Sequence, residues 1–271
     1  MTSDLVAEIV ESLKASRKYR SVYEPTLERV AKWALERHCN RRVAEKAAKR
    51  KLHQACGAYM SPSQAAKAEK MLRALPPTAT IDELRQACLE ILKCHTSTLE
   101  RLDYIERLYA DIEELVGRPR SVLDLAAGLN AFTIPWAPLL ANATYKCIDI
   151  DCRSMVLSNL LLERLGRNCS AICGDVLVAM PTDRVDLVII LKSLPCLERQ
   201  ESGAARRILK EIRARYCVVS FPAFSLGGRD RGMTANYEEF LRDSIDCSWR
   251  IIADLSYSTE TVYVLTSEPG A

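Results

Sequence analysis

The stretch SVLDLAAGLN, Ser121 to Asn130, decides how the chain folds. A short apolar run ends around Asp124, and Gly128 lies in the turn before the next helical stretch. From here on, short apolar runs alternate with helical stretches, which is typical of an α/β fold with a mostly parallel sheet covered on both faces. The predicted strands are Val122–Leu125, Tyr145–Ile150, Ala171–Cys173, Val185–Leu191, Tyr216–Phe221, Arg250–Leu255 and Thr261–Leu265. A short turn joins the last two, so we expect them to form an antiparallel hairpin.

Acidic residues stand at the ends of the first three predicted strands. Asp124 and Asp149 close the first two, and Asp175 directly follows the third. In an α/β fold these positions meet at the carboxyl edge of the sheet, where carboxylates can accept hydrogen bonds from ribose hydroxyls or an adenine amino group. Each acid alone could be a helix cap, but three at successive strand ends favour an adenosine pocket.

The turn after the first strand narrows the choice of ligand. It contains one glycine, Gly128, rather than G-x-G-x-x-G, and it lacks G-K-[ST], which argues against a dinucleotide and against a P-loop. An acid, small residues and one glycine fit S-adenosylmethionine (SAM), whose amino-acid tail needs a close approach of the backbone. We expect the SAM contacts to include Ala126, Gly128 and Val176 beside the three acids.

A second informative stretch, VVSFPAFSLGGRDRGM, covers Val218 to Met233. Pro222 ends a buried strand because proline has no N–H for the ladder, and three glycines then surround Arg229 and Arg231. Glycines permit close approach to a ligand, and arginine forks suit phosphate. We predict that Lys192, at the end of the fourth strand, positions the substrate together with Arg229 and Arg231. A flexible surface loop and a solvated strand-end lysine are the alternatives.

Helical periodicity accounts for the chain before the sheet. The predicted helices cover about residues 3–16, 25–38, 41–56 and 61–75, with another that begins after residue 80. Thr80 and Glu83 form a capping box for that helix. A long helix then runs from Ser97 to about Val116, with Leu99 on its buried apolar face.

The charge of the chain is unevenly distributed. Residues 1–75 contain 16 Lys and Arg against 8 Asp and Glu, whereas the remainder contains 22 against 27. A basic N-terminal third on an acidic body suggests a module for a polyanion. We divide the chain into a basic helical docking domain (1–76), a helical linker that packs on the next domain (77–119) and a domain that binds SAM (120–271). The predicted contacts of the first domain with such a polyanion, for example a nucleic acid, are Arg17, Lys18, Arg41, Arg42, Lys46, Arg50 and Lys51, and a solvated helix face is the alternative.

Cysteine and histidine usage argues against metal and disulfide chemistry. The eleven cysteines include no C-x-x-C pair, and the three histidines are scattered, so we expect reduced thiols and no metal site in a cytoplasmic protein. No apolar run approaches the roughly 18 residues of a membrane span, and the acidic amphipathic start is not a signal peptide. We expect a monomer with no membrane partner.

Taken together, the motifs resemble those of the 16S ribosomal RNA (guanine-N7) methyltransferases that confer aminoglycoside resistance. The similarity is nearly full-length, and its most specific part is SFPAFSLGGRDRGM at 220–233. Its other markers are SRKYR (16–20), KLHQACGAYM (51–60), CHTSTLERL (94–102), LDLAAGLN (123–130), CGDVL (173–177) and LKSLPCLER (191–199). The resemblance implies a SAM-dependent methyltransferase with a Rossmann-like, mostly parallel seven-stranded sheet and an all-helical N-terminal domain.

The resemblance also implies roles for single residues. Arg101 is expected to reach the SAM carboxylate from the long helix, Asp149 to bind the ribose and Asp175 to bind the adenine. Two positions depart from the pattern of the family. Ala131 stands where proline is expected, which loosens the SAM turn, and Phe224 replaces a basic residue, which removes one phosphate contact.

The implied reaction methylates N7 of a guanine in the decoding A-site of 16S rRNA, within the assembled 30S subunit. Guanine N7 has a free lone pair, so the enzyme needs no general base and acts by orientation. A flipped base needs an apolar or aromatic wall, for which Phe132, Trp136 and Phe221 are candidates. The alternatives are methylation of another rRNA base, such as an A-site adenine at N1, and an RNA-binding protein that keeps the fold without turnover.

Overall fold

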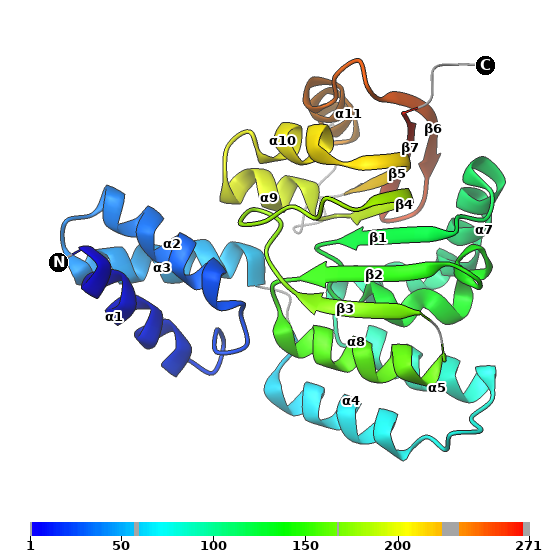
Figure 1. The fold of residues 1–271 in the computed structure, drawn as a ribbon, viewed down its shortest axis with the longest axis horizontal. Coiled ribbons are helices and arrows are strands. Elements are labelled where there is room, and N and C mark those ends of the chain that lie inside the picture. The colour runs from blue at the N-terminus through cyan, green and yellow to red at the C-terminus, as the bar shows by residue number, and fades with distance from the viewer. Residues whose placement is uncertain (1, 57–59, 167, 224–232, 268–271) are drawn as a thin grey trace.

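The computed structural model describes residues 2–56, 60–166, 168–223 and 233–267. Its centre is one sheet in the strand order β3-β2-β1-β4-β5-β7-β6 (Figure 1). Strands β1 to β5 are parallel to one another, β7 is antiparallel to β5, and β6 is antiparallel to β7. The strands are β1 Ser121–Leu125, β2 Thr144–Asp149, β3 Cys169–Cys173, β4 Arg184–Leu191, β5 Arg213–Pro222, β6 Arg250–Ser256 and β7 Glu260–Thr266. The predicted mostly parallel seven-stranded sheet is therefore confirmed, including its C-terminal hairpin.

Helices precede the sheet and connect its strands. Those before it are α1 Thr2–Ala15, α2 Glu24–Arg37, α3 Arg41–Cys56, α4 Pro62–Ala74, α5 Ile81–Leu92, α6 Thr96–Leu99, the 3₁₀ turn η1 Leu102–Tyr104 and α7 Ile105–Val116. Those after β1 are η2 Asn130–Trp136, η3 Pro138–Leu140, α8 Cys152–Arg164, α9 Leu194–Gln200, α10 Ala204–Glu211 and α11 Met233–Ser244. Capping boxes at Ser61 and Thr80 satisfy free N–H groups where α4 and α5 begin. No described helix is both long and apolar enough to cross a membrane.

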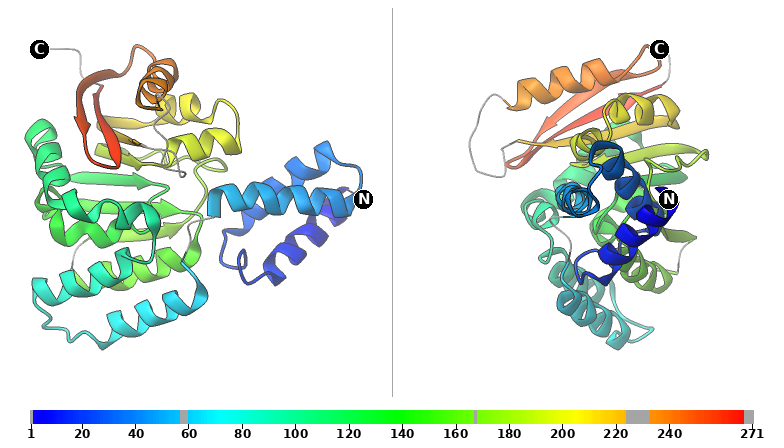
Figure 2. Two further views of the ribbon diagram at one scale, coloured as in Figure 1. Left: turned by 180° about the vertical axis from the view of Figure 1, so that it is seen from behind. Right: turned by 90° about the vertical axis from the view of Figure 1, so that its left-hand side faces the viewer.

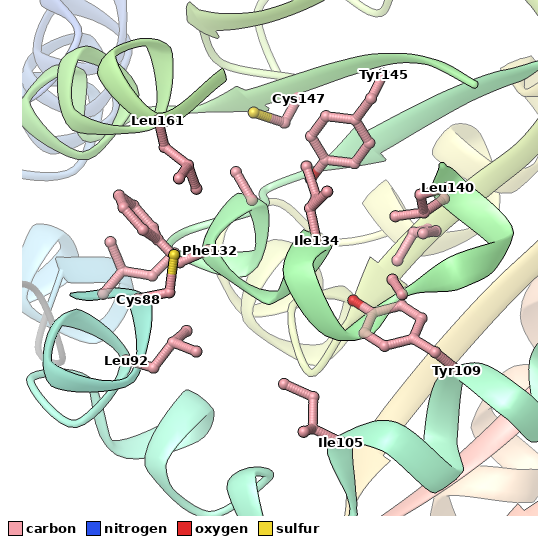
Figure 3. Close-up of a cluster of buried hydrophobic side chains, with 14 of the residues drawn as sticks. Cys88, Leu92, Ile105, Tyr109, Phe132, Ile134, Leu140, Tyr145, Cys147 and Leu161 are labelled. Carbon is pink, nitrogen blue, oxygen red and sulfur yellow. The ribbon is translucent and has the colours of Figure 1, made fainter. Parts of the chain in front are cut away.

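Helices cover both faces of the sheet. On one face, α4, α5, α7 and α8 pack against it, and Figure 3 shows Leu92, Tyr109, Phe132 and Leu161 converging from different helical segments. On the other face, α9, α10 and α11 bury a second apolar cluster. Each fully buried large apolar side chain contributes about 1.5–3 kcal/mol. This burial holds the strand ends, and the polar groups on them, in place.

Helices α1, α2 and α3 have an apolar core of their own, built around Ile9, Leu13, Leu27 and Leu52. This group stands beside the carboxyl ends of the strands (Figures 1 and 2). Helix α4 lies instead against α8, and its buried side chains belong to the core of the sheet. The packing thus divides the chain earlier than the predicted boundary at residue 76.

The predicted long helix from Ser97 to Val116 is wrong, because this segment does not form one continuous helix. The segment is broken into α6, η1 and α7, and Leu99 is 48% exposed rather than buried. The break directs Arg101 and Tyr104 toward the sheet, where both bond to Glu260. Apolar spacing cannot reveal a break that serves a buried polar contact distant in sequence.

Candidate functional site

The site lies at the carboxyl edge where the strand order reverses. From β1, β2 and β3 lie to one side and β4 to the other, and α/β folds bind their ligands beyond the carboxyl ends of the strands at such a reversal. After β1 the backbone enters the left-handed region at Ala126 (φ 51°) and Gly128 (φ 54°). A Cβ at Gly128 would meet no atom within 4 Å among the described residues, so this turn is open on its outer side. The geometry suits a ligand that approaches the backbone closely.

Asp124 lies near the carboxyl end of β1 and is 1% exposed. Its Oδ2 accepts hydrogen bonds from Asn130 Nδ2 (2.7 Å) and the Tyr145 hydroxyl (2.6 Å). Its Oδ1 is buried and has no partner among the described residues. Burial raises the pKa of Asp124 to about 6. A buried carboxylate oxygen without a donor is costly, and a ligand ammonium group would satisfy it.

Asp149, the last residue of β2, is also buried. Its two oxygens accept from the backbone N–H of Gly128 (2.9 Å) and of Asp151 (2.8 Å). These bonds tie the turn after β1 to the end of β2. Burial raises the pKa of Asp149 to about 6. Each carboxylate oxygen has two lone pairs, so Asp149 keeps capacity for ribose hydroxyls.

Asp175 has partners that the sequence did not predict. Its Oδ2 accepts from Thr26 Oγ1 (2.9 Å) and from Nη2 (3.0 Å) and Nε (3.2 Å) of Arg29, both on α2. Its Oδ1 accepts from the backbone N–H of Leu177 (2.8 Å). The side chain thus attaches the N-terminal helices to the sheet. Val176, predicted to contact SAM, is buried in the core beneath α9 and α10.

Backbone contacts reinforce this attachment. The N–H of Tyr23 donates to the carbonyl of Ile150 (2.8 Å), and the N–H of Cys152 donates to the carbonyl of Ser21 (2.9 Å). Both bonds flank an isolated antiparallel bridge between Val22 and Asp151. The N-terminal helices therefore reach the loop directly after Asp149.

The expectation of reduced thiols is wrong for one pair. The structure contains a disulfide between Cys152, at the start of α8, and Cys173, at the end of β3, with a Cα–Cα distance of 4.7 Å. The two cysteines are 21 residues apart and meet because β2 and β3 are neighbours. Spacing along the chain could not show this proximity. Among the described residues, no group of His, Cys, Asp or Glu could hold a metal ion.

Lys192 directly follows β4, on the other side of this reversal in strand order. Its backbone is left-handed (φ 57°), which is uncommon for a residue with a side chain. Its N–H donates to the carbonyl and to the hydroxyl of Ser220, at 3.0 Å each. Its Nζ forms an ion pair with Glu100 (2.8 Å), and the side chain is 9% exposed. Lys192 is thus held at the edge by side-chain and backbone contacts.

Arg101 lies nearby and is also buried. Its Nε and Nη2 donate to the two oxygens of Glu260, at 2.6 and 2.8 Å. Glu260 is the first residue of β7 and is fully buried. Burial would raise the pKa of Glu260, but the charge and hydrogen bonds of Arg101 outweigh it and lower that pKa. The pair leaves Arg101 Nη1 outside the Glu260 contact.

Two of the three aromatic candidates for the target-base wall are buried in the cores. Phe132 is fully buried beneath α5 and α8 (Figure 3), and Phe221 is packed against Tyr237 and Phe240. Neither presents a face to a ligand, so that expectation is wrong for both. Trp136 is half-buried beside the same core as Phe132.

Most of the basic residues predicted to meet RNA are exposed, on α3 or in the turn after α1. These are Arg17, Lys18, Arg41, Arg42, Lys46 and Arg50. Arg42, Lys46 and Arg50 recur every four residues on α3 and therefore share one face. Lys51 differs, because it is 8% exposed and its Nζ lies 4.1 Å from the centre of the Trp33 ring. Burial lowers the pKa of Lys51, and its position does not suit a phosphate contact.

Arg229 and Arg231 lie outside the described residues. The residues that sequence reasoning missed are Thr26, Arg29, Glu100, Tyr104, Ser220 and Glu260. Each acts through a partner far away in sequence. Glu260 offered one local signal, a carboxylate that begins an otherwise apolar strand.

The family described as "Ribosomal RNA methyltransferase (FmrO)" matches residues 15–264. Relatives named 16S rRNA (guanine(1405)-N(7))-methyltransferase from Micromonospora rosea and Proteus mirabilis are 32% and 31% identical, and the alignments cover 97% and 96% of this chain and 97% of each relative.

Solved structures give the same result. The 16S rRNA methyltransferase RmtF in complex with S-adenosyl-L-homocysteine (SAH) is 29% identical, with a TM-score of 0.84 over 96% of this chain and 97% of that one. The 16S rRNA methylase RmtB is 28% identical, with a TM-score of 0.81 over 96% and 98%. The match over most of the chain, together with the fold, shows that this protein belongs to the FmrO family of ribosomal RNA methyltransferases.

Proposed function

We propose that the chain transfers the methyl group of SAM to N7 of a guanine in the decoding A-site of 16S rRNA, within the 30S subunit, and thereby confers aminoglycoside resistance. The names of its relatives supply the substrate. The observation that carries the cofactor is the unpartnered Asp124 Oδ1 beside the open turn at Gly128. These groups fit the ammonium group and the amino-acid tail of SAM.

The residues present can divide the cofactor among them. Asp124 would hold the ammonium group, Arg101 the carboxylate through its remaining edge, and Asp149 the ribose. Asp175 remains the proposed partner of the adenine amino group, although its Oδ2 already accepts bonds from α2. SAM supplies an electrophilic methyl group, and SAH leaves when the N7 lone pair forms the new bond.

The protein's own contribution is orientation. A guanine N7 needs no general base, so removal of any one side chain should leave some reaction. We propose that Lys192, Arg229 and Arg231 position the target nucleotide, and that the exposed face of α3 docks on rRNA phosphates through Arg42, Lys46 and Arg50. The chain would work as a monomer with a docking part and a catalytic part.

The decisive experiment maps the modified base. Purified 30S subunits are incubated with the protein and SAM, and the rRNA is cleaved by borohydride and aniline, which act at N7-methylguanine, before reverse transcription. A cleavage stop at an A-site guanine supports the proposal. A reverse-transcription stop at an A-site adenine without cleavage would support N1 methylation. SAH binding with no methylation would support the RNA-binding alternative.

Charge reversal tests the two proposed RNA surfaces separately. Reversal of Arg42, Lys46 and Arg50 to Glu should weaken 30S binding and flatten its salt dependence, with SAH affinity unchanged. Arg229→Glu or Arg231→Glu should instead lower the methylation rate more than 30S affinity, because a positioning contact acts on one base. If the α3 variant binds 30S subunits with an unchanged salt dependence, the docking role of α3 is wrong. If the Arg229 and Arg231 variants methylate at the normal rate, their positioning role is wrong.

A further inference from the structure

Glu260 is a buried carboxylate at the edge of the sheet and accepts four hydrogen bonds. Its Oε1 accepts from Arg101 Nε (2.6 Å) and from the Tyr104 hydroxyl (3.1 Å). Its Oε2 accepts from Arg101 Nη2 (2.8 Å) and from the Ser220 hydroxyl (2.9 Å). The residue has no exposed surface. Four donors on two oxygens leave Glu260 itself no evident role in binding a ligand.

The first consequence of this arrangement concerns the orientation of Arg101. A guanidinium is planar, so a bidentate contact along Nε and Nη2 determines the plane and direction of its remaining edge. Without Glu260 the side chain would have several rotamers and a buried, unpaired charge. With Glu260 the remaining edge, which carries Nη1, has one direction.

The second consequence concerns the turn at Lys192. The Ser220 hydroxyl donates to Glu260 and accepts from the N–H of Lys192 (3.0 Å). These two hydrogen bonds connect Glu260 to Lys192, whose backbone is left-handed after the end of β4. A positive φ at a lysine is unfavourable and persists only where neighbours hold it. Glu260 orients the hydroxyl that supplies one of those holding contacts.

A parallel set of contacts reaches the Lys192 side chain. The Tyr104 hydroxyl also lies 2.6 Å from Thr259 Oγ1, which lies 3.3 Å from the carbonyl of Glu100. Because Tyr104 donates its proton to Glu260, the single Thr259 hydroxyl proton serves both of these contacts. Glu100 in turn pairs with Lys192 Nζ (2.8 Å). The segment Glu100–Tyr104 is thus attached to the start of β7 at several points. Displacement of Glu260 would disturb both Arg101 and the partner of Lys192.

We propose that Glu260 is a positioning residue for methyl transfer, which aims Arg101 at the carboxylate of SAM and holds the Lys192 turn against the target nucleotide. The inference rests on the proposed function. Glu260 touches neither substrate nor cofactor and acts only through Arg101, Ser220 and Tyr104. An ion pair that serves stability alone would instead affect folding and leave the affinity for a cofactor unchanged.

The test compares Glu260→Asp and Glu260→Gln with the matched control Glu113→Gln, whose carboxylate pairs with Arg118 away from this network. Glu260→Asp keeps the charge and moves it back by one methylene, so Arg101 stays paired but shifts. Thermal melting, SAH calorimetry and single-turnover methylation of 30S subunits are measured on the full chain. We expect Glu260→Asp to melt as a folded protein and bind SAH about tenfold more weakly, with Glu113→Gln unaffected.

Ser220→Ala separates the two consequences, since it leaves the ion pair in place. It should bind SAH normally and methylate about fivefold more slowly, because only the Lys192 turn loses its contact. A folded Glu260→Asp variant that binds SAH within twofold of the parent overturns the Arg101 half of the proposal, and a normal rate in Ser220→Ala overturns the Lys192 half. If Glu260→Gln does not fold, Glu260→Asp still decides.

Failure of the proposed function gives a different pattern. A parent protein that does not bind SAH refutes the cofactor assignment, and Glu260 then has no positioning role to play. A parent that binds SAH but does not methylate 30S subunits refutes the substrate, while the SAH affinities of the Glu260 variants still test the Arg101 contact.

Discussion

Two arginine–carboxylate pairs lie at opposite halves of the carboxyl edge, and they differ in what they connect. Arg29 and Asp175 join α2 to the segment after β3, and the arginine keeps 20% of its side chain exposed. Arg101 and Glu260 join the segment after α6 to β7, with 3% and 0% exposed. The first pair attaches the N-terminal helices to the sheet, and the second lies within the body that contains the sheet.

The two pairs differ in how tightly they fix the groups that they join. In the Arg29 contact, two nitrogens donate to one oxygen of Asp175. Such a contact tolerates small shifts of the N-terminal helices relative to the sheet. The Arg101 contact uses both oxygens of Glu260, with two further hydroxyl donors, so it defines a single geometry. We expect the first pair to influence docking and the second to influence stability and the cofactor.

The largest effect should come from Arg101→Ala. The variant leaves the Glu260 carboxylate buried without its cation, which costs about 3–5 kcal/mol in the free energy of unfolding. Arg118→Ala, which removes an arginine from the exposed pair with Glu113, should cost less than about 1 kcal/mol. Urea denaturation of both variants gives the comparison. If both variants lose the same free energy of unfolding, the buried pair contributes no more to stability than the exposed pair.

Asp124 lies between the two pairs, and Asp124→Asn should come next. The amide can keep one hydrogen bond with Tyr145 or Asn130 but loses the charge that we assign to the SAM ammonium group. The loss should weaken SAM binding by about 1.5–3 kcal/mol, measured by calorimetry. Asp183→Asn, at an exposed pair with Lys146, is the control. SAM affinity equal to that of the parent would remove Asp124 from the cofactor site.

The pH dependence of SAM binding should be smaller. Burial raises the pKa of Asp124 and of Asp149 to about 6, so both carboxylates lose charge as the pH falls through that value. Between pH 7 and pH 5, SAM affinity should therefore weaken by about tenfold. A flat profile, or a profile that Asp124→Asn leaves unchanged, would argue against the assignment.

The same shifts predict the opposite trend for stability without ligand. The pKa of each acid is higher in the folded state than the ordinary value of 3.8, so the folded state binds these protons more tightly. Their contribution to stability is present at low pH and is lost as the pH rises through about 6. The midpoint of urea denaturation, measured between about pH 4 and pH 7, reports this loss of stability.

Arg29→Ala should have the smallest effect on the fold, about 1 kcal/mol, because the pair is partly hydrated. Its consequence should be local, with faster hydrogen exchange where Tyr23 and Cys152 bond across the two bodies. Lys32→Ala, an exposed lysine on the same helix, is the control. Exchange that rises equally over the whole sheet would mean that Arg29 supports the entire fold.

The sequence by itself determined the alternation of strands and helices, the hairpin at the end and the acids at the strand ends. It also determined the turn around Gly128. Strand periodicity and turn preference are local properties, because they depend on residues that are adjacent in the sequence. The full family resemblance was readable in the same way, from contiguous motifs such as residues 123–130 and 220–233.

Only the tertiary structure decided which partners those residues have. Arg101 and Glu260 are 159 residues apart, and Arg29 and Asp175 are 146 apart. No local pattern encodes such pairs, because they depend on strand order and on how the helices pack. For the same reason the break in the predicted long helix, the burial of Lys51 and the Cys152–Cys173 disulfide escaped prediction. Each results from contact between distant segments, whose energy is absent until the sheet has formed.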